Sequence, residues 1–274
     1  MFKRPVAKIG DFTFAAVLAI ASLYPVLWLF SISFQPDTDA YKVPTKWFFK
    51  PDFANYQHLL SDPNFVASLI NSLQLTVIST LLCVIFGTLS AYALSRFKVR
   101  GAMAITRILA FSRLVPSFAI VIPTFFIYRK FNMLDTMPGL ILALVAFQVP
   151  LSTLIMYRII NAIPRAFDES ASLDGAGFFR TLWQVILPIA KPGLVASAVV
   201  TFILVWNEFL FVLVLAGNKI VTIPITIATF QSDKQILWGS IAAASVISLL
   251  PIMLFFAFAQ KYLLSGMGMG ALRD

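Results

Sequence analysis

Six long apolar stretches dominate this sequence and restrict it to a membrane protein. A helix needs about 20 apolar residues to cross a bilayer, and six segments qualify: 12–34, 65–95, 102–128, 139–160, 193–216 and 238–264. Charged residues make up only 12% of the chain and the mean hydropathy is +0.88, whereas a soluble domain is about one quarter charged. The sequence therefore predicts an all-α membrane protein with six transmembrane helices in a single domain, residues 1–274.

The distribution of Lys and Arg predicts the orientation of the chain, because cytoplasmic loops carry an excess of these residues. Thirteen of the 21 basic residues lie on the side that holds both termini and the segment 161–192, which we call the inner loop. Seven lie on the opposite side, and Arg113 falls within an apolar segment. We therefore expect both termini and the inner loop to be cytoplasmic. No basic run with interleaved aromatic residues indicates nucleic acid.

The inner loop has the pattern of a short helix. Pro164 stands where a helix can begin, because its missing N–H would have no partner there. Asp168 and Glu169 follow within the first two turns, where carboxylates suit a helix N-terminus. Gly175 and Gly177 then offer a stop. We expect a helix over about residues 164–174.

The rest of the inner loop suggests a contact surface. A second helical piece is expected to end at Pro188, with Pro192 starting the next apolar helix. Small side chains let another protein approach the backbone, and an exposed Phe167 or Phe178 could fill a pocket in that partner. The alternative is an ordinary connection that contains a chance helix. At helical spacing, the residues on this face or beside it are Ala166, Phe167, Ser170, Ala171 and Asp174.

A spaced motif in the inner loop resembles a known family. The run 169–171 (Glu-Ser-Ala), then Gly175, then 185–188 (Val-Ile-Leu-Pro) resembles the Glu-Ala-Ala…Gly…Ile-x-Leu-Pro loop of permease subunits of bacterial ATP-binding-cassette importers. The motif differs at Ser170, which replaces the first Ala, and at Val185, which replaces the Ile. In that family the loop is a coupling helix that docks on the ATPase. The residues to which we assign this coupling are Phe167, Glu169, Ser170, Ala171, Asp174, Gly175 and Pro188.

The resemblance covers nearly the whole chain and implies the type I importer permease fold in the bacterial cytoplasmic membrane. It also implies three partners: a second permease subunit in a heterodimer, a dimer of ATP-binding subunits, and an extracytoplasmic substrate-binding protein. The sequence contains no G-x-x-x-x-G-K-[ST] phosphate loop. We therefore expect a non-catalytic permease without a cofactor, with ATP and Mg²⁺ bound by the partner ATPase.

Polar residues inside the apolar segments are the candidates for a substrate pathway: Arg113, Gln148, Asn207 and Glu208. A charge inside a membrane segment is costly, so Arg113 should face a partner or a watery cavity, or else snorkel to the inner interface. Glu208 is either functional or a structural hydrogen-bonding group, and Asn207 is either packing or pathway. The stretch 206–209 (Trp-Asn-Glu-Phe) resembles one common in the carbohydrate-uptake branch of the family, which implies a sugar as substrate. A disaccharide, an oligosaccharide, a related polyol and glycerol phosphate are the alternatives.

Two other classes of protein compete with this interpretation. An ion-gradient-driven secondary transporter would use Arg113 and Glu208 as a charged relay, but six helices without visible repeats are few for that class. An intramembrane enzyme lacks support, because the sequence has neither H-E-x-x-H nor G-x-S-x-G. The single Cys83 excludes an intrachain disulfide or a cysteine metal site, and the single His58 lies outside the apolar segments.

Overall fold

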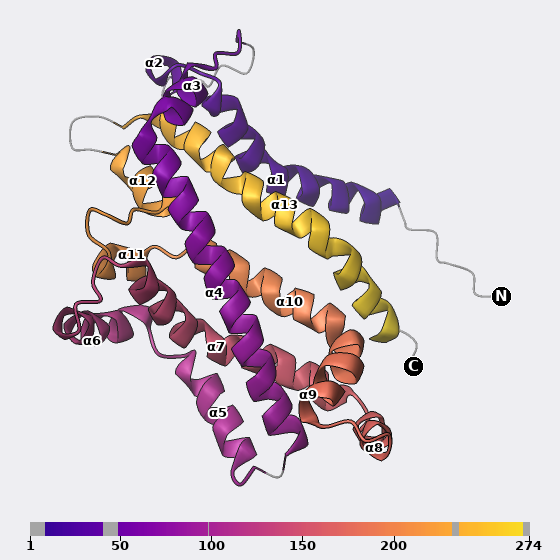
Figure 1. Cartoon of the computed structure of the whole chain (residues 1–274). Coiled ribbons are helices and arrows are strands. Elements are labelled where there is room, and N and C mark those ends of the chain that lie inside the picture. The colour runs from indigo at the N-terminus through magenta and orange to yellow at the C-terminus, as the bar shows by residue number, and fades with distance from the viewer. Residues whose placement is uncertain (1–8, 41–48, 98, 232–235, 271–274) are drawn as a thin grey trace. The chain divides into compact units, whose positions relative to one another are not determined.

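The computed structural model describes residues 9–40, 49–97, 99–231 and 236–270, most of which are helical (Figure 1). Within these residues, the strand-like geometry is an isolated antiparallel bridge between Gln231 and Ile236. The all-α prediction is therefore confirmed. The elements are α1 (Ile9–Ser33), α2 (Asp37–Ala40), α3 (Ala54–Ser61), α4 (Pro63–Arg96), α5 (Ala102–Ser112), α6 (Ser117–Lys130), α7 (Met137–Ala162), α8 (Ala166–Leu173), α9 (Phe178–Thr181), the π-helix η1 (Leu182–Ile186), α10 (Leu187–Trp206), α11 (Leu210–Leu215), α12 (Ile223–Thr229) and α13 (Trp238–Gly270).

The apolar helices match the six predicted spans in number. By length and composition, five helical stretches of the described chain can cross a membrane: Phe12–Ser33, Pro63–Arg96, Met137–Ala162, Phe178–Trp206 and Trp238–Tyr262. The pair α5 and α6 adds a sixth span if it is counted as one, although the two helices are bent by 95°. The predicted spans therefore exist, and one of them is broken.

The chain forms two compact units. Unit 1 contains residues 1–66 and 227–249, and unit 2 contains residues 67–226 and 250–274. In unit 1, side chains satisfy the backbone groups that helix ends leave open. The carboxylate of Asp37 accepts the N–H of Gly239 at the start of α13 (2.7 Å). The amide of Asn55 donates to the carbonyls of Ser33 (3.2 Å) and Gln35 (2.8 Å) beside the end of α1.

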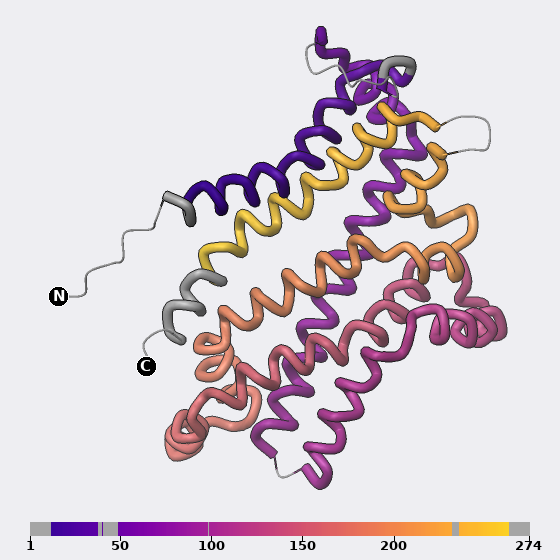
Figure 2. Tube along the Cα trace, turned by 180° about the vertical axis from the view of Figure 1, so that it is seen from behind, coloured from indigo at the N-terminus to yellow at the C-terminus, as the bar shows by residue number. Residues whose placement is uncertain are grey.

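In unit 2, α7 and α10 pack against each other and run side by side in both views (Figure 2). Gly87 of α4 packs directly on Ser152 of α7, because a Cβ at Gly87 would lie 2.7 Å from the Cβ of Ser152. The hydroxyl of Ser152 in turn bonds that of Ser197 on α10 (2.9 Å). Small residues thus bring the three helices together, as expected for membrane helix packing.

The third predicted span, 102–128, is not one helix, and of its two prolines, both of which we expected to bend it, Pro116 marks the break. Helix α5 ends at Ser112, and α6 begins only after Pro116, whose backbone is extended (φ −60°, ψ 139°). Proline lacks the N–H for an intrahelical bond and disfavours helical backbone in the residue before it. Pro123, by contrast, lies inside α6 without ending it.

The helix that follows α8 begins earlier in the sequence than predicted. We expected a helical piece ending at Pro188 and a fresh start at Pro192, but the helix is continuous from Phe178 to Trp206. The prolines are accommodated inside it. The ring of a proline clashes with the carbonyl four residues earlier, which for Pro188 belongs to Gln184. Gln184 lies within the π-turn η1, whose wider winding relieves this clash.

The fifth predicted span, 193–216, is interrupted near its end. Helix α10 stops at Trp206, and α11 starts at Leu210. The side-chain amide of Asn207 donates to the carbonyl of Ile203 (2.8 Å). The carboxylate of Glu208 accepts the N–H of Phe211 (3.0 Å). These two polar side chains satisfy backbone groups on either side of the break.

The packing at Gly87 gives a testable expectation. We predict that Gly87→Ala lowers stability by about 1–3 kcal/mol, the usual cost of overpacking. Ser197→Ala should cost less, because interhelical hydrogen bonds in membranes average about 0.6 kcal/mol. The measurement is the melting temperature of the detergent-solubilised protein. Gly177→Ala is the matched control, since no atom lies within 4 Å of a Cβ there. A larger loss for Ser197→Ala would contradict the packing account.

Candidate functional site

Helix α8 is the short helix that the sequence predicts, and it ends in a Schellman motif. Its last residue is Leu173, and Gly175 follows in left-handed backbone (φ +77°). The N–H of Gly175 bonds the carbonyl of Ser172 (3.0 Å), and the N–H of Ala176 bonds that of Ala171 (2.9 Å). This pair of bonds closes a helix end on a glycine. The predicted role of Gly175 as the stop is confirmed.

Helix α8 presents a mixed apolar and polar face to the outside of the chain. Phe167 is 46% exposed and Leu173 is 90% exposed. The remaining residues assigned to coupling that are also exposed are Glu169, Ser170, Asp174, Gly175 and Pro188. Ala171 is buried and packs toward its own chain, so it supports α8 from behind. The sequence analysis missed Leu173, although it lies three residues after Ser170 and seven after Ala166 and so shares their helical face.

Charged and aromatic contacts hold the base of α8 on the last turn of α4. The hydroxyl of Tyr92 donates to Asp168 Oδ1 (2.9 Å), and Arg96 Nε lies 2.9 Å from Asp168 Oδ2. Arg96 also donates to the carbonyl of Ile163 (2.9 Å). The side chains of Arg96 and Asp168 are only 8% and 19% exposed. The carboxylate of Asp168 therefore faces α4 and is not part of the outward face.

Phe178 secures the other side of the inner loop. It is half-buried, its ring is stacked on that of Phe97 (centroids 5.3 Å apart), and it is tilted against that of Tyr92 (5.1 Å). The expectation that Phe178 is exposed and fills a partner's pocket is therefore wrong. Phe179 beside it is 65% exposed instead. The loop is thus attached to the end of α4 both before and after α8, and Figure 1 shows α8 at that end of unit 2.

Arg113 lies at the break between α5 and α6 and has its partner within the chain. Its guanidinium donates to the carbonyl of Phe147 on α7 (2.8 Å) and lies 4.6 Å from the centre of the Phe147 ring. These contacts supply both a hydrogen bond and a cation–π interaction. A partly open pocket of about 480 Å³ lies between α6 and α7 next to this break, lined in part by Thr124, Phe147 and Phe211.

The structure connects the candidate pathway residues through two aromatic rings. Phe147 lies 5.2 Å from Phe211, centre to centre, and the N–H of Phe211 is the donor to Glu208. Gln148, next to Phe147, is 2% exposed, and its Oε1 has no hydrogen-bond partner among the described residues. Arg113 and Glu208 thus belong to one connected region of unit 2, and Gln148 follows Phe147 of that region in the sequence. Asn207 is exposed beside it.

Asp135 is a structural residue that the sequence analysis missed. It has left-handed backbone (φ +53°), and its carboxylate accepts the N–H groups of Lys219 (3.2 Å) and Ile220 (3.1 Å). Burial alone raises the pKa of Asp135, but hydrogen bonds from the backbone of Gly217, Lys219 and Ile220 outweigh it and hold the pKa below its ordinary value. Its partners are 84 and 85 residues away in sequence, so no local pattern indicates them.

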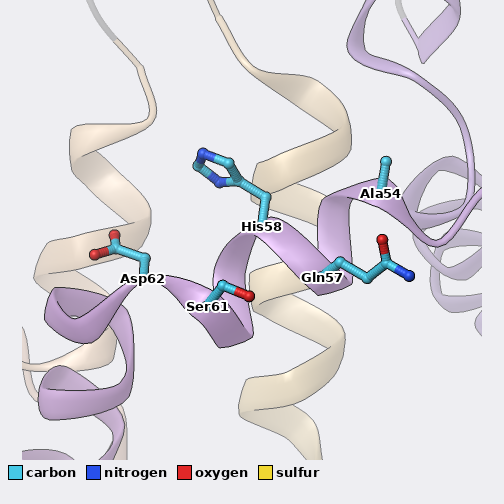
Figure 3. A pocket seen from close by; sticks show the side chains of 5 residues that line it. All are labelled: Ala54, Gln57, His58, Ser61 and Asp62. Carbon is cyan, nitrogen blue, oxygen red and sulfur yellow. The ribbon is translucent and has the colours of Figure 1, made fainter.

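A polar hollow lies on the exposed side of α3 in unit 1. Figure 3 shows the side chains that line it: Ala54, Gln57, His58, Ser61 and Asp62. The single histidine of the chain thus lies on a surface helix, outside the apolar spans. Among the described residues, no group of three or more His, Cys, Asp and Glu side chains is arranged to hold a metal ion.

The fold and the inner loop define the permease subunit of an ATP-binding-cassette importer, and comparison with known proteins agrees. Residues 83–268 match the family described as the binding-protein-dependent transport system inner membrane component. The chain is 35% identical to the trehalose/maltose transport system permease protein MalG of Thermococcus litoralis, covering 100% of this chain and 98% of that protein. It is 33% identical to the trehalose transport system permease protein SugB of Mycobacterium tuberculosis, and the match covers 92% of this chain and 93% of that protein.

Solved structures share the fold. A bacterial transporter involved in import of the acidic polysaccharide alginate matches with a TM-score of 0.78 and 25% identity, over 96% of this chain and 99% of that chain. The methionine transporter MetNI matches with a TM-score of 0.61 and 15% identity, over 77% of this chain and 98% of that chain. The chain therefore belongs to the family of inner membrane components of binding-protein-dependent transport systems, and the predicted type I importer permease fold is confirmed.

The Schellman end of α8 predicts a difference between two neighbouring glycines. Gly175→Ala places a Cβ in left-handed backbone, which costs about 1–2 kcal/mol. We expect backbone amides of the inner loop to exchange with solvent about tenfold faster, as measured by hydrogen–deuterium exchange. Gly175→Asn should exchange at an intermediate rate, because Asn tolerates this backbone better. Gly177→Ala, where φ is −75°, is the control. Equal exchange in all variants would contradict the account.

Proposed function

We propose that this chain carries a sugar across the bacterial cytoplasmic membrane, driven by a separate ATPase that docks on α8. The chemical class of the substrate is supported by its relatives. Trehalose, maltose and alginate, which are named for three of the proteins above, are all saccharides. The stretch 206–209 adds the sequence resemblance to the carbohydrate-uptake branch.

The observation that carries the docking proposal is the exposure of Phe167 and Leu173 on a helix held firmly at its base. Two large apolar side chains that project from one short helix form a surface suited to an apolar cleft in a partner. Glu169, exposed on the same helix, is available to pair with a basic residue of that partner. Because α8 is fixed to the end of α4, a cleft that grips it can transmit a displacement.

Three partners complete the proposed assembly. A second permease subunit would pair with this chain in a heterodimer, and two ATP-binding subunits would engage the two coupling helices. A substrate-binding protein would deliver the sugar on the opposite side of the membrane, where we place α3 and its polar hollow. ATP and Mg²⁺ would be bound by the ATPase alone. The termini and α8 would both face the cytoplasm, in agreement with the distribution of Lys and Arg.

Alternating access is the mechanism that this arrangement supports. ATP binding would close the ATPase dimer and move the coupling helices with it, so that the helix bundle opens outward, and hydrolysis would reset it inward. This chain contributes a rigid, capped helix for the ATPase to hold. It also contributes the connected region around Arg113, Gln148 and Glu208, which we propose borders the path of the sugar.

The ion-driven alternative is less well supported. It would use Arg113 and Glu208 as a charged relay, but each side chain is already engaged with a backbone group. Arg113 donates to the carbonyl of Phe147, and Glu208 accepts from the N–H of Phe211. The family membership of the chain also favours the ATP-driven importer.

The docking role of α8 is tested by a change on its exposed face. We predict that Leu173→Asp weakens capture of the ATPase about 30-fold, the effect of losing a contact worth about 2 kcal/mol. Capture is measured by quantitative pull-down from detergent-solubilised membranes. Leu60→Asp is the matched control, because Leu60 is also exposed (57%) but lies on α3. Undiminished capture by the Leu173 variant, with normal expression, would rule out docking through this face.

The pathway role of the connected region is tested by uptake. We predict that Arg113→Ala or Glu208→Ala changes the KM or the maximal rate for labelled trehalose about tenfold, while co-purification with the ATPase survives. The physical reason is that Arg113→Ala removes the bond from the end of α5 to α7, and Glu208→Ala leaves the N–H of Phe211 at the break after α10 without its partner. Uptake is measured in membrane vesicles supplied with ATP, with unlabelled maltose as competitor. Unchanged kinetics in both variants would exclude them from the path.

A further inference from the structure

The contacts between α4 and the inner loop form a defined group, which we call the latch. It consists of the ion pair between Arg96 and Asp168, the bond from Tyr92 to Asp168, and two bonds to backbone carbonyls. In those last two bonds, Arg96 donates to Ile163 (2.9 Å) and Arg165 donates to Ser95 (3.2 Å). The bonds run in both directions between the helix end and the loop, so they restrain sliding as well as separation.

The latch is not explained by stability alone. The side chains of Arg96 and Asp168 are mostly removed from solvent, and the loss of hydration of a buried ion pair largely cancels its attraction. Apolar residues of similar size would hold the loop to α4 at least as firmly. Unlike apolar contacts, the ion pair and the hydrogen bonds are directional, so they fix one orientation of α8 relative to α4.

Helix α4 connects the latch to the other end of unit 2. It has 34 residues, which corresponds to a length of about 50 Å. Near its beginning, the side-chain amide of Asn71 donates to the carbonyl of Val221 (3.1 Å), and the hydroxyl of Ser72 accepts the N–H of Ile223 (2.8 Å). The helix that carries the latch is therefore bonded at its far end to the segment that follows α11.

We propose that Arg96 and Asp168 are positioning residues that transmit the displacement of α8 through α4 to the segment around residues 221–223. This inference rests on the proposed docking of an ATPase at α8 and deepens it. The latch residues do not touch the ATPase or the sugar. They act by fixing α8 to the helix that reaches the predicted outer side.

The test follows the segment that is bonded to the far end of α4 during ATP binding. A cysteine is introduced at Asn218, which is exposed and lies outside the predicted spans, in a Cys83→Ser background of the complete transporter in vesicles. The rate at which a membrane-impermeant maleimide labels this cysteine is measured with and without ATP and vanadate, alongside the rate of ATP hydrolysis. This readout requires no knowledge of the sugar. We expect ATP and vanadate to change the labelling rate when the latch is intact.

Breaking the latch should separate hydrolysis from this movement. Asp168→Asn and Arg96→Gln should each reduce the ATP-dependent change in labelling about fivefold, a typical coupling effect, while hydrolysis continues. The double variant should behave like either single variant, since the two residues act as a pair. Asp168→Glu should restore part of the change. Arg158→Gln, which removes an exposed cation from α7, is the control and should retain the change.

The outcomes are distinguishable. Absence of ATP hydrolysis in the transporter with an intact latch would overturn the proposed function itself. Normal hydrolysis with no ATP-dependent change in labelling at residue 218 would overturn the latch. A change in labelling that Asp168→Asn leaves undiminished would overturn it as well. Equal losses of hydrolysis and of movement in the variants would show a purely structural role and overturn it too. Should both variants fail to assemble, Tyr92→Phe, which removes one hydrogen bond and keeps both charges, must show the same selective loss.

Discussion

The structure depends on one constraint, which is that backbone N–H and C=O groups inside a bilayer must be satisfied by the protein itself. Long helices meet this requirement, and at the break between α10 and α11 two polar side chains take over. Asn207 donates to the carbonyl of Ile203, and Glu208 accepts the N–H of Phe211. At Pro188 the helix continues instead, because the π-turn η1 relieves the clash of the proline ring. Arg113, beside the break after α5, donates to the carbonyl of Phe147 within α7 and so joins two helices.

A second set of contacts, within the inner loop and to the end of α4, explains why α8 is ordered. Helix α8 has only eight residues, too few for a stable isolated helix. Its order comes from the Schellman end at Gly175 and from the attachment of its base to α4. Since the outward face is left free of these contacts, Phe167 and Leu173 remain available to a partner.

Much of this could be predicted from the sequence, and the errors have physical causes. The six spans, the short helix and the stop at Gly175 follow from local patterns of apolar residues, proline and glycine. The helix breaks at Pro116 but continues through Pro188, and the sequence rules for proline do not distinguish these two outcomes. A proline ends a helix unless the neighbouring turn relieves the clash of its ring, as the π-turn η1 does at Pro188. Asp135 and the latch were missed because their partners lie far away in the sequence.

The central claim, that α8 is the surface on which the ATPase docks, is tested most directly by site-specific cross-linking. A cysteine at Leu173 in a Cys83→Ser background, with a short bifunctional reagent in native membranes, reports what lies against α8. The account predicts a cross-link to an ATP-hydrolysing subunit from position 173 and none from a cysteine at Gln57 on α3. Cross-links to that subunit from position 57 and none from position 173 would contradict it.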